Sequence, residues 1–261
     1  MNIKIYQVDA FTSKVFKGNP AAVIILKKWM KDSMMQKISY ENNLSETAFA
    51  VPSEEGYEIR WFTPEVEVDL CGHATLATAH VLWKHLGYAH DEIVFHSSHS
   101  GILYVRKTGK LLGLDFPADR VEKMEIPSFA KAALGVSPQE AFRGKSDLMF
   151  LFGEERSIRE VRPDFALLPK LGGRGVIVTA PGEEVDFVSR FFAPQSGIDE
   201  DPVTGSAHTT LTPYWSGVLK KEVLSARQIS RRGGELLCED CGERVKISGE
   251  AVTYMTGEIY I

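Results

Sequence analysis

One carboxylate stands out because of the residues around it. Glu46 opens the segment ETAFAV, in which it alternates with Ala48 and Ala50. Alternate residues of a strand share a face, so the pattern predicts a carboxylate on a face of small apolar side chains. Charged residues are rarely placed there for stability, and a buried carboxylate suits general acid and base chemistry. The alternative is an exposed carboxylate at the end of a strand.

Two glycine turns open predicted helices. Gly72 precedes a stretch that reaches Trp83, and Gly205 precedes one that reaches Trp215. The start of a helix offers free backbone N–H groups and a partial positive charge, and glycine lets a ligand approach the backbone closely. The two turns therefore predict a receptor for a small carboxylate, although both could equally be plain structural turns.

Three polar residues lie at these turns. His73 could orient a reacting group, or it could be a helix-start residue that bonds to the backbone. Asp201 could orient an amine or imidazole of the substrate, or cap the turn that leads to Gly205. Ser206 could bind a carboxylate, or be an ordinary residue of a first helical turn. Their placement at two related turns favours the functional interpretation of all three.

The turns are related because the chain repeats itself at about half its length. The segment PSEEGYEIRWFTP from Pro52 resembles PGEEVDFVSRFFAP from Pro181, about 130 residues later, and Gly205 follows Gly72 at nearly the same offset. Gly175 takes the place of Glu46 in the second copy, so only one copy carries the carboxylate. The alternative is a chance similarity between two unrelated strand-turn-helix units.

Runs of short strands separated by turns, with few helices, predict an α+β fold with mostly antiparallel sheets. We expect one half-domain over residues 1–120 and a second over 121–261, with a boundary between Pro117 and Pro127. In an alternative arrangement, the C-terminal strand returns to the first half. Helical spacing after Gly72 predicts a helix that stops at Gly87, and Pro213 should kink or end the second helix.

The composition excludes several classes of protein. The net charge of -5 and the lack of a basic run with aromatics give no support for a nucleic-acid partner. No apolar stretch approaches the length of a membrane span, and the N-terminus alternates like a strand rather than a leader. Cysteines occur only at positions 71, 238 and 241, which favours a reducing, cytoplasmic location.

Two weaker signals are set aside. Cys238 and Cys241 have the spacing of half a zinc site, but no second pair completes it, so we expect no metal. The segment Gly144-Lys145-Ser146 resembles the end of a phosphate-binding loop, but Gln139 stands where the first glycine would be. Nucleotide binding therefore has no support.

Four motifs, spread along nearly the whole chain in order, resemble the PhzF-like family of phenazine-biosynthesis isomerases, which shares the fold of diaminopimelate epimerase. They are DAFTSKVFKGNPAAV near the start, NNLSETAF around Glu46, RWFTPEVEVDLCGHATLA around His73, and DEDPVTGSAH around Asp201. The resemblance implies two pseudo-symmetric domains, each a sheet curled around a central helix. It also implies an active site in a cleft between them and, commonly, a homodimer.

The same resemblance implies a biosynthetic, cofactor-free isomerase in which Glu46 shuttles a proton within a small anionic metabolite. His73, Asp201 and Ser206 would assist, and the amides of Gly72 and Gly205 would hold the substrate carboxylate.

Related epimerases use two thiols. Cys71 matches the first, and its thiolate would be favoured at a helix start. Pro202 matches the second and has no exchangeable side-chain proton. A two-base epimerase that uses Cys71 with Glu46 remains an alternative, as does a non-catalytic metabolite-binding or scaffold protein.

Overall fold

The computed structural model describes residues 2–261, which divide into two compact units. The first unit comprises the chain up to residue 115 together with residues 248–261, and the second comprises residues 116–247. The chain passes from one unit to the other inside β8 (Leu111–Pro117), slightly before the boundary expected from the sequence. It returns near the end of β17 (Arg244–Gly249), and the last strand, β18 (Ala251–Tyr260), pairs with β1 (Asn2–Ala10) of the first unit.

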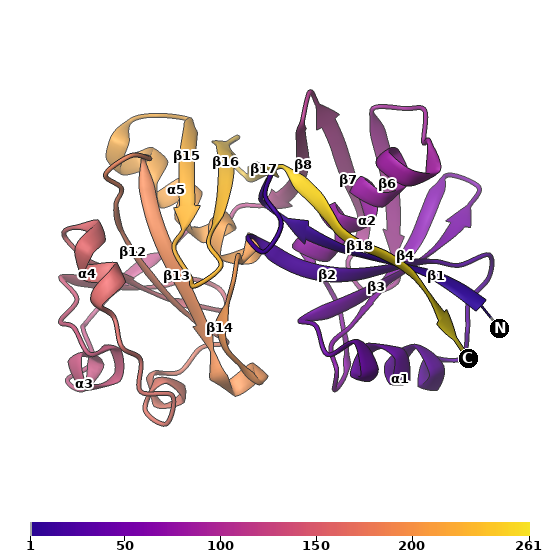
Figure 1. The fold of residues 1–261 in the computed structure, drawn as a ribbon. Helices are drawn as coiled ribbons and strands as arrows, with labels where there is room; N and C mark the ends of the chain where they lie inside the picture. Colours follow the sequence, from indigo (N-terminus) through magenta and orange to yellow (C-terminus); the bar gives the residue numbers. More distant parts are fainter. Residues whose placement is uncertain (1) are drawn as a thin grey trace. The chain divides into compact units, whose positions relative to one another are not determined.

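The first unit is built from strands that pair in an alternating pattern (Figure 1). β1 is antiparallel to β2, β2 is parallel to β3, and β3 is antiparallel to β4. β4 is antiparallel to β5 and parallel to β6, which continues antiparallel into β7 and then β8. The remaining elements are β2 (Asn19–Ile25), α1 (Asp32–Asn42), β3 (Glu46–Ser53), β4 (Gly56–Phe62), β5 (Glu67–Val68), α2 (Gly72–Leu86), β6 (Glu92–Ser97) and β7 (Gly101–Thr108).

Helix α2 forms the centre of this unit. Its apolar residues from Ala74 to Leu82 are buried, and it packs against β1, β2 and β3. Phe49 and Val51 of β3 join Met35 of α1 in a separate cluster, so β3 is covered on both faces. Strands covered on both faces are apolar nearly throughout, as β3 is. Since alternate residues point to opposite faces, the small residues of β3 face α2.

The second unit repeats this plan. β10 is antiparallel to β11, β11 is parallel to β12, β12 is antiparallel to β13, and β13 is parallel to β15, which continues antiparallel into β16. β9 pairs with β10, and β14 with β13. The elements are β9 (Glu122–Met124), α3 (Ala130–Leu134), β10 (Glu140–Arg143), β11 (Leu148–Leu151), α4 (Glu155–Glu160), η1 (Leu168–Leu171), β12 (Val176–Pro181), β13 (Phe187–Ala193), η2 (Pro194–Ser196), β14 (Ile198–Asp201), α5 (Gly205–Leu219), β15 (Val223–Gln228) and β16 (Gly234–Asp240).

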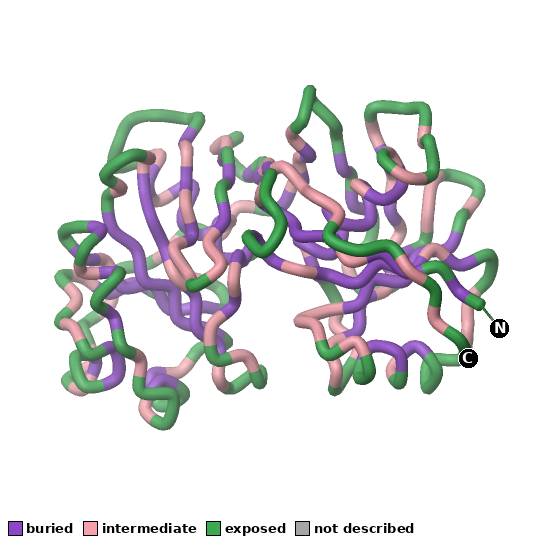
Figure 2. Tube along the Cα trace, in the orientation of Figure 1, coloured by how far each residue is buried: buried purple, intermediate pink, exposed green. Residues whose placement is uncertain are grey.

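The order of antiparallel and parallel pairings is thus the same in both units, which confirms the predicted pseudo-symmetric α+β fold. In each unit a strand pair, a short strand and a long helix follow in sequence: β3, β4, β5 and α2, then β12, β13, β14 and α5. Most of β12 and β13 is buried, whereas β18 is largely exposed or half-buried (Figure 2).

Helix α2 begins and ends where the sequence predicts, with Gly87 in the left-handed conformation at φ 69°. Helix α5 begins at Gly205 as expected, but it does not end at Pro213 and continues to Leu219. Proline cannot donate a hydrogen bond to the carbonyl four residues before it, here that of Thr209. The backbone N–H of Asp119 donates to that carbonyl at 3.1 Å, so the acceptor is satisfied and the helix can continue.

Gly175 marks the difference between the two units. It stands just before β12, at the place that Glu46 occupies in the repeat. A Cβ atom at Gly175 would lie 2.2 Å from the ring of Phe191 on β13. The ring therefore fills the space that a side chain would need, and the second unit cannot carry a counterpart of Glu46 without rearrangement.

We expect Gly175→Ala to lower the free energy of unfolding by roughly 1–3 kcal/mol, because the Phe191 ring must move. Gly217→Ala is the matched control, since Gly217 lies inside α5 with open space around its Cβ position. That change should raise stability by roughly 0.5–1 kcal/mol. Urea unfolding of the two variants measures both effects, and equal stabilities would contradict the steric argument.

Candidate active site

Glu46 and His73 form the centre of a polar cluster in the first unit. Glu46 is the first residue of β3, and His73 is the second residue of α2. Glu46 Oε2 lies 3.2 Å from His73 Nε2, and the two side chains are only 12% and 7% exposed. Ala48 and Ala50 leave room for α2 to approach β3, which brings the imidazole to the carboxylate. The carboxylate is therefore not an exposed strand end.

Cys71 completes this cluster from the other side of the imidazole. It is the N-cap residue of α2, and its Sγ lies 3.4 Å from His73 Nδ1. Thr75 donates to the Cys71 carbonyl from its hydroxyl at 2.7 Å and from its backbone N–H at 3.1 Å. These bonds fix the helix start, so His73 Nδ1 faces the Cys71 thiol while Nε2 faces the Glu46 carboxylate.

The thiol of Cys71 is not activated in this setting. Burial and the charge of Glu46 raise its pKa to about 11, which outweighs the opposing effect of His73. The expectation of a favoured thiolate at the helix start is therefore wrong, because desolvation and a neighbouring carboxylate both disfavour a second negative charge there.

His73 is shifted in the direction that favours its charge. Burial alone would lower its pKa, but the neighbouring Cys71 and Glu46 raise the pKa of His73 well above its usual value. Because Cys71 is a neutral thiol near neutral pH, we attribute the shift mainly to the carboxylate at 3.2 Å. The resting cluster is an imidazolium paired with a carboxylate.

This ion pair leaves hydrogen-bonding capacity unused. Among the residues that the structure describes, neither Glu46 Oε2 nor His73 Nε2 has a well-aligned hydrogen-bond partner, although both atoms are buried. Buried polar atoms are nearly always paired, and exceptions occur at sites that bind or react. The unpaired atoms therefore make this cluster the candidate ligand-binding site of the first unit.

The second unit holds three of the expected residues at the start of α5. Asp201 ends β14 and accepts a hydrogen bond from the hydroxyl of Thr204, the N-cap residue of the helix. Gln228 donates to the Asp201 carbonyl at 2.7 Å and accepts from the Thr204 N–H at 2.9 Å. Thr204 immediately precedes α5, as Cys71 immediately precedes α2, so by position Thr204 rather than Pro202 is the counterpart of Cys71. With either residue, the second unit has no thiol at this place.

Ser206 receives a contact that sequence reasoning missed. Arg174 donates from Nη2 to Ser206 Oγ at 2.9 Å and also forms two hydrogen bonds to the buried carboxylate of Asp147. Because the arginine donates, the hydroxyl proton of Ser206 remains available to a ligand. The one sequence signal for Arg174 is its place beside Gly175, the counterpart of Glu46.

Gly205 is not required by the fold itself. Its backbone is outside the left-handed region, and a Cβ atom built there meets nothing within 4 Å. Glycine costs stability in a helix, so the lack of a structural reason favours a role in admitting a ligand. Gly72, the corresponding first residue of α2, is half-buried.

The cluster of the first unit also has metal-ligand chemistry. Ligand atoms of Glu46, Cys71 and His73 lie within 4.8 Å of one another, and all three residue types bind Zn²⁺. A metal ion would have to displace one proton from the Cys71 thiol and one from the His73 imidazolium. Binding would therefore depend strongly on pH.

Two units with the same order of strand pairings, each with a long helix that begins at a glycine, have the fold of epimerase-like proteins. The chain matches the phenazine biosynthesis-like (PhzC-PhzF) family over residues 8–257. It is 51% identical over 259 residues to an uncharacterized isomerase of Pseudomonas aeruginosa, with 99% of each chain covered. The protein therefore belongs to the PhzF family.

Solved structures agree with this assignment. The crystal structure of a PhzF-family protein from Enterococcus faecalis superposes with a TM-score of 0.98 at 50% identity and full coverage of both chains. A predicted epimerase of Pseudomonas aeruginosa shares the fold, with a TM-score of 0.75 at 21% identity and 99% coverage of both. The predicted family is confirmed, and its named relatives support an isomerase.

No helix within residues 2–261 combines the length and the apolar character that crossing a bilayer requires.

The ion pair gives a prediction about titration. In the folded wild type, His73 should titrate above its unfolded pKa near 6.5, so the pair contributes stability that is complete below that pH. This contribution should be lost as the pH rises through the raised value. In Glu46→Gln the imidazole loses its counter-ion, and NMR of the His73 ring protons should show a titration at lower pH. An unchanged midpoint would contradict the pairing.

Proposed function

We propose that the protein is a cofactor-independent isomerase that moves a proton within a small carboxylate metabolite, with Glu46 as the acid and base. The observation that carries this proposal is the Glu46 carboxylate, only 12% exposed and 3.2 Å from His73, with buried atoms that lack aligned partners among the described residues. Because the pKa of the neighbouring His73 is raised, the imidazolium can serve as a counter-ion for a carboxylate that accepts a proton from carbon.

The reaction would proceed in two proton transfers. Glu46 removes a proton from a carbon activated by a neighbouring unsaturation or carboxylate, and the bonding electrons shift along the ligand. The same carboxyl group then returns the proton to another carbon on the same face, so no proton is gained or lost overall. His73 orients the carboxylate and stabilises it when it is charged. The low exposure of both side chains limits exchange of the transferred proton with water.

In this proposal the polar groups of the second unit bind the substrate. We assign Asp201 and Ser206 as groups that contact the substrate, and the amides at Gly72 and Gly205 as donors to its carboxylate. A helix start provides such donors in preorganised form. Arg174 holds Ser206 with its hydroxyl proton available, which fits a donor to a carboxylate oxygen.

Replacing Glu46 with Gln should reduce turnover by about 10²–10⁴-fold, because general acid and base catalysis contributes that much. The assay is proton NMR of a panel of small unsaturated carboxylates and amino acids in deuterated water. Glu54→Gln is the matched control, since Glu54 is an exposed carboxylate in the turn after β3. Full activity in Glu46→Gln, with wild-type folding by circular dichroism, would rule out the assignment.

Gly205→Ala separates a binding role from a structural one. The fold has room for the methyl group, so stability should be unchanged or slightly higher. If a substrate carboxylate rests against this backbone, the methyl group should raise the apparent dissociation constant by about tenfold or more. Thermal unfolding and ligand titration measure the two effects. A variant that binds as the wild type does would remove Gly205 from the site.

One observation favours a second candidate, the two-base epimerase. Cys71 Sγ lies 3.4 Å from His73, which places a protonated thiol, a candidate second acid, in the same cluster as Glu46. Cys71→Ala discriminates the two functions: the isomerase should keep most of its turnover, whereas an epimerase should lose it. A ligand that stabilises the wild type but never exchanges its carbon protons would instead favour a non-catalytic binding protein.

A further inference from the structure

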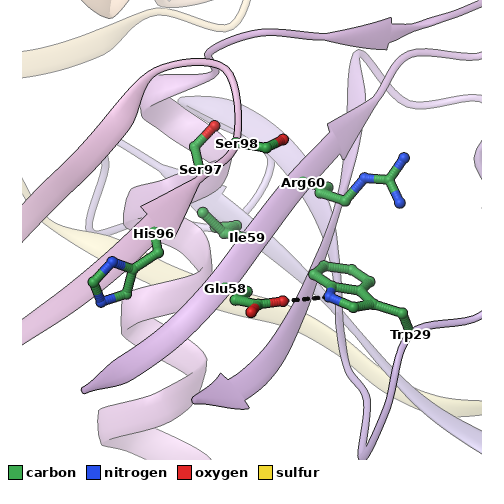
Figure 3. A pocket seen from close by; sticks show the side chains of 7 residues that line it. All are labelled: Trp29, Glu58, Ile59, Arg60, His96, Ser97 and Ser98. Atoms are coloured by element: carbon green, nitrogen blue, oxygen red, sulfur yellow. Dashed lines mark hydrogen bonds between the residues drawn. The ribbon is translucent and has the colours of Figure 1, made fainter. Parts of the chain in front are cut away.

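The first unit has two pockets of similar size that differ in whether their charged side chains are paired. One has a volume of about 370 Å³ and is drawn in Figure 3. There Glu58 accepts a hydrogen bond from the Trp29 indole, and the Arg60 guanidinium pairs with two carboxylates. His96 lies 2.8 Å from the Glu55 carbonyl. The charged groups of this pocket are thus paired by the protein itself.

The other pocket, of about 350 Å³, is cationic. It lies beside the C-terminal half of α2, and its lining residues are His80, Trp83, Lys84, Lys107, Gly109, Lys110, Leu112, Glu250 and Ala251. The lining thus contains three lysines and one residue with a carboxylate, Glu250. In a chain with a net charge of -5, this is a local reversal of sign.

The lysines come from separate elements and lack counter-ions. Lys84 is in the last turn of α2, Lys107 is on β7, and Lys110 is in the tight turn between β7 and β8. Within the described part of the chain, none of the three forms an ion pair with a carboxylate. The helix C-terminus favours a cation at Lys84, but it gives no reason for the other two to be there.

His80 lies next to these lysines in the lining of the pocket. Its Nε2 lies 2.9 Å from the Thr253 hydroxyl on β18. Burial, together with the positive charges of His85, Lys84 and Lys107, lowers the pKa of His80 to about 4. The imidazole is therefore neutral near pH 7.

One wall of the pocket is aromatic and held in place. Trp83 donates its indole N–H to the His90 carbonyl at 2.7 Å. The ring is therefore fixed rather than free to fill the pocket. A planar organic group could pack on it, while an anionic group meets the lysines.

We propose that this pocket binds a phosphate monoester, with the phosphate held by Lys84, Lys107 and Lys110 and the organic group against Trp83. Lysine ammonium groups bind phosphate oxygens through charge-assisted hydrogen bonds. A dianion balances the excess of two positive charges that three lysines and Glu250 leave. The volume lies at the lower end of the range for small-molecule sites. This site is separate from the Glu46 cluster and does not depend on the proposed isomerase.

The test is calorimetric titration of the full chain with inorganic phosphate and with phenyl phosphate, at constant ionic strength in a phosphate-free buffer. We expect both to bind, with phenyl phosphate about tenfold tighter because its ring packs on Trp83. Trp83→Leu should remove that preference. Equal affinity for the two probes in the wild type would overturn the monoester assignment.

A matched pair of charge variants tests the site itself. Lys107→Gln with Lys110→Gln should weaken phenyl phosphate binding by about tenfold or more. Lys28→Gln with Lys37→Gln removes the same charge from exposed positions of the same unit outside the pocket, and it should have little effect. Equal losses in both double variants, or wild-type binding weaker than about 10 mM, would overturn the proposal. The titrations measure binding and not isomerase activity. A failure of the phosphate site can therefore be distinguished from a failure of the proposed function.

Discussion

The buried contact between Glu46 and His73 is the constraint on which the rest of the site depends. A carboxylate removed from water is strongly disfavoured unless a charge or several hydrogen bonds compensate it. Here one imidazolium 3.2 Å away supplies the compensation, and neither atom of the contact is otherwise well bonded within the described residues. The two charges stabilise each other, and both atoms keep hydrogen-bonding capacity that a ligand could use.

Several features of the first unit follow from the need to form this contact. Small residues on one face of β3 let α2 lie close, and the start of the helix must fall at Gly72 for His73 to face the carboxylate. Cys71 at the N-cap then lies on the other side of the imidazole, where burial keeps it protonated. The geometry therefore places one carboxyl group and one neutral thiol around the same ring.

The two units share one order of strand pairings but differ in their polar groups. Both units use the same order of strand pairings and a helix that begins at a glycine. At the position of Glu46, however, the second unit has Gly175 under the Phe191 ring. Its polar groups are instead gathered at the start of α5, where Arg174 links a buried Asp147 to Ser206. One unit presents a carboxylate, and the other presents hydrogen-bond donors.

The parts of this arrangement that local sequence encodes were predictable. The alternation around Glu46, the glycine turns before both long helices and the cap at Gly87 are signals within a few residues, and the repeat indicated the fold. Long-range contacts were not predictable. Helix α5 passes Pro213 because Asp119, distant in sequence, donates to the Thr209 carbonyl, and Arg174 meets Ser206 only after folding. The raised pKa of Cys71 likewise depends on burial that no local motif specifies.

In the proposed reaction, one carboxyl group carries one proton between two carbons of the same molecule. The most direct measurement uses a turned-over substrate from the NMR panel, deuterated at the carbon that loses its proton and incubated in ordinary water. A substantial fraction of the deuterium should reappear at the second carbon of the product. Complete loss of the label to solvent in every turnover would contradict a shielded, single-carboxylate shuttle.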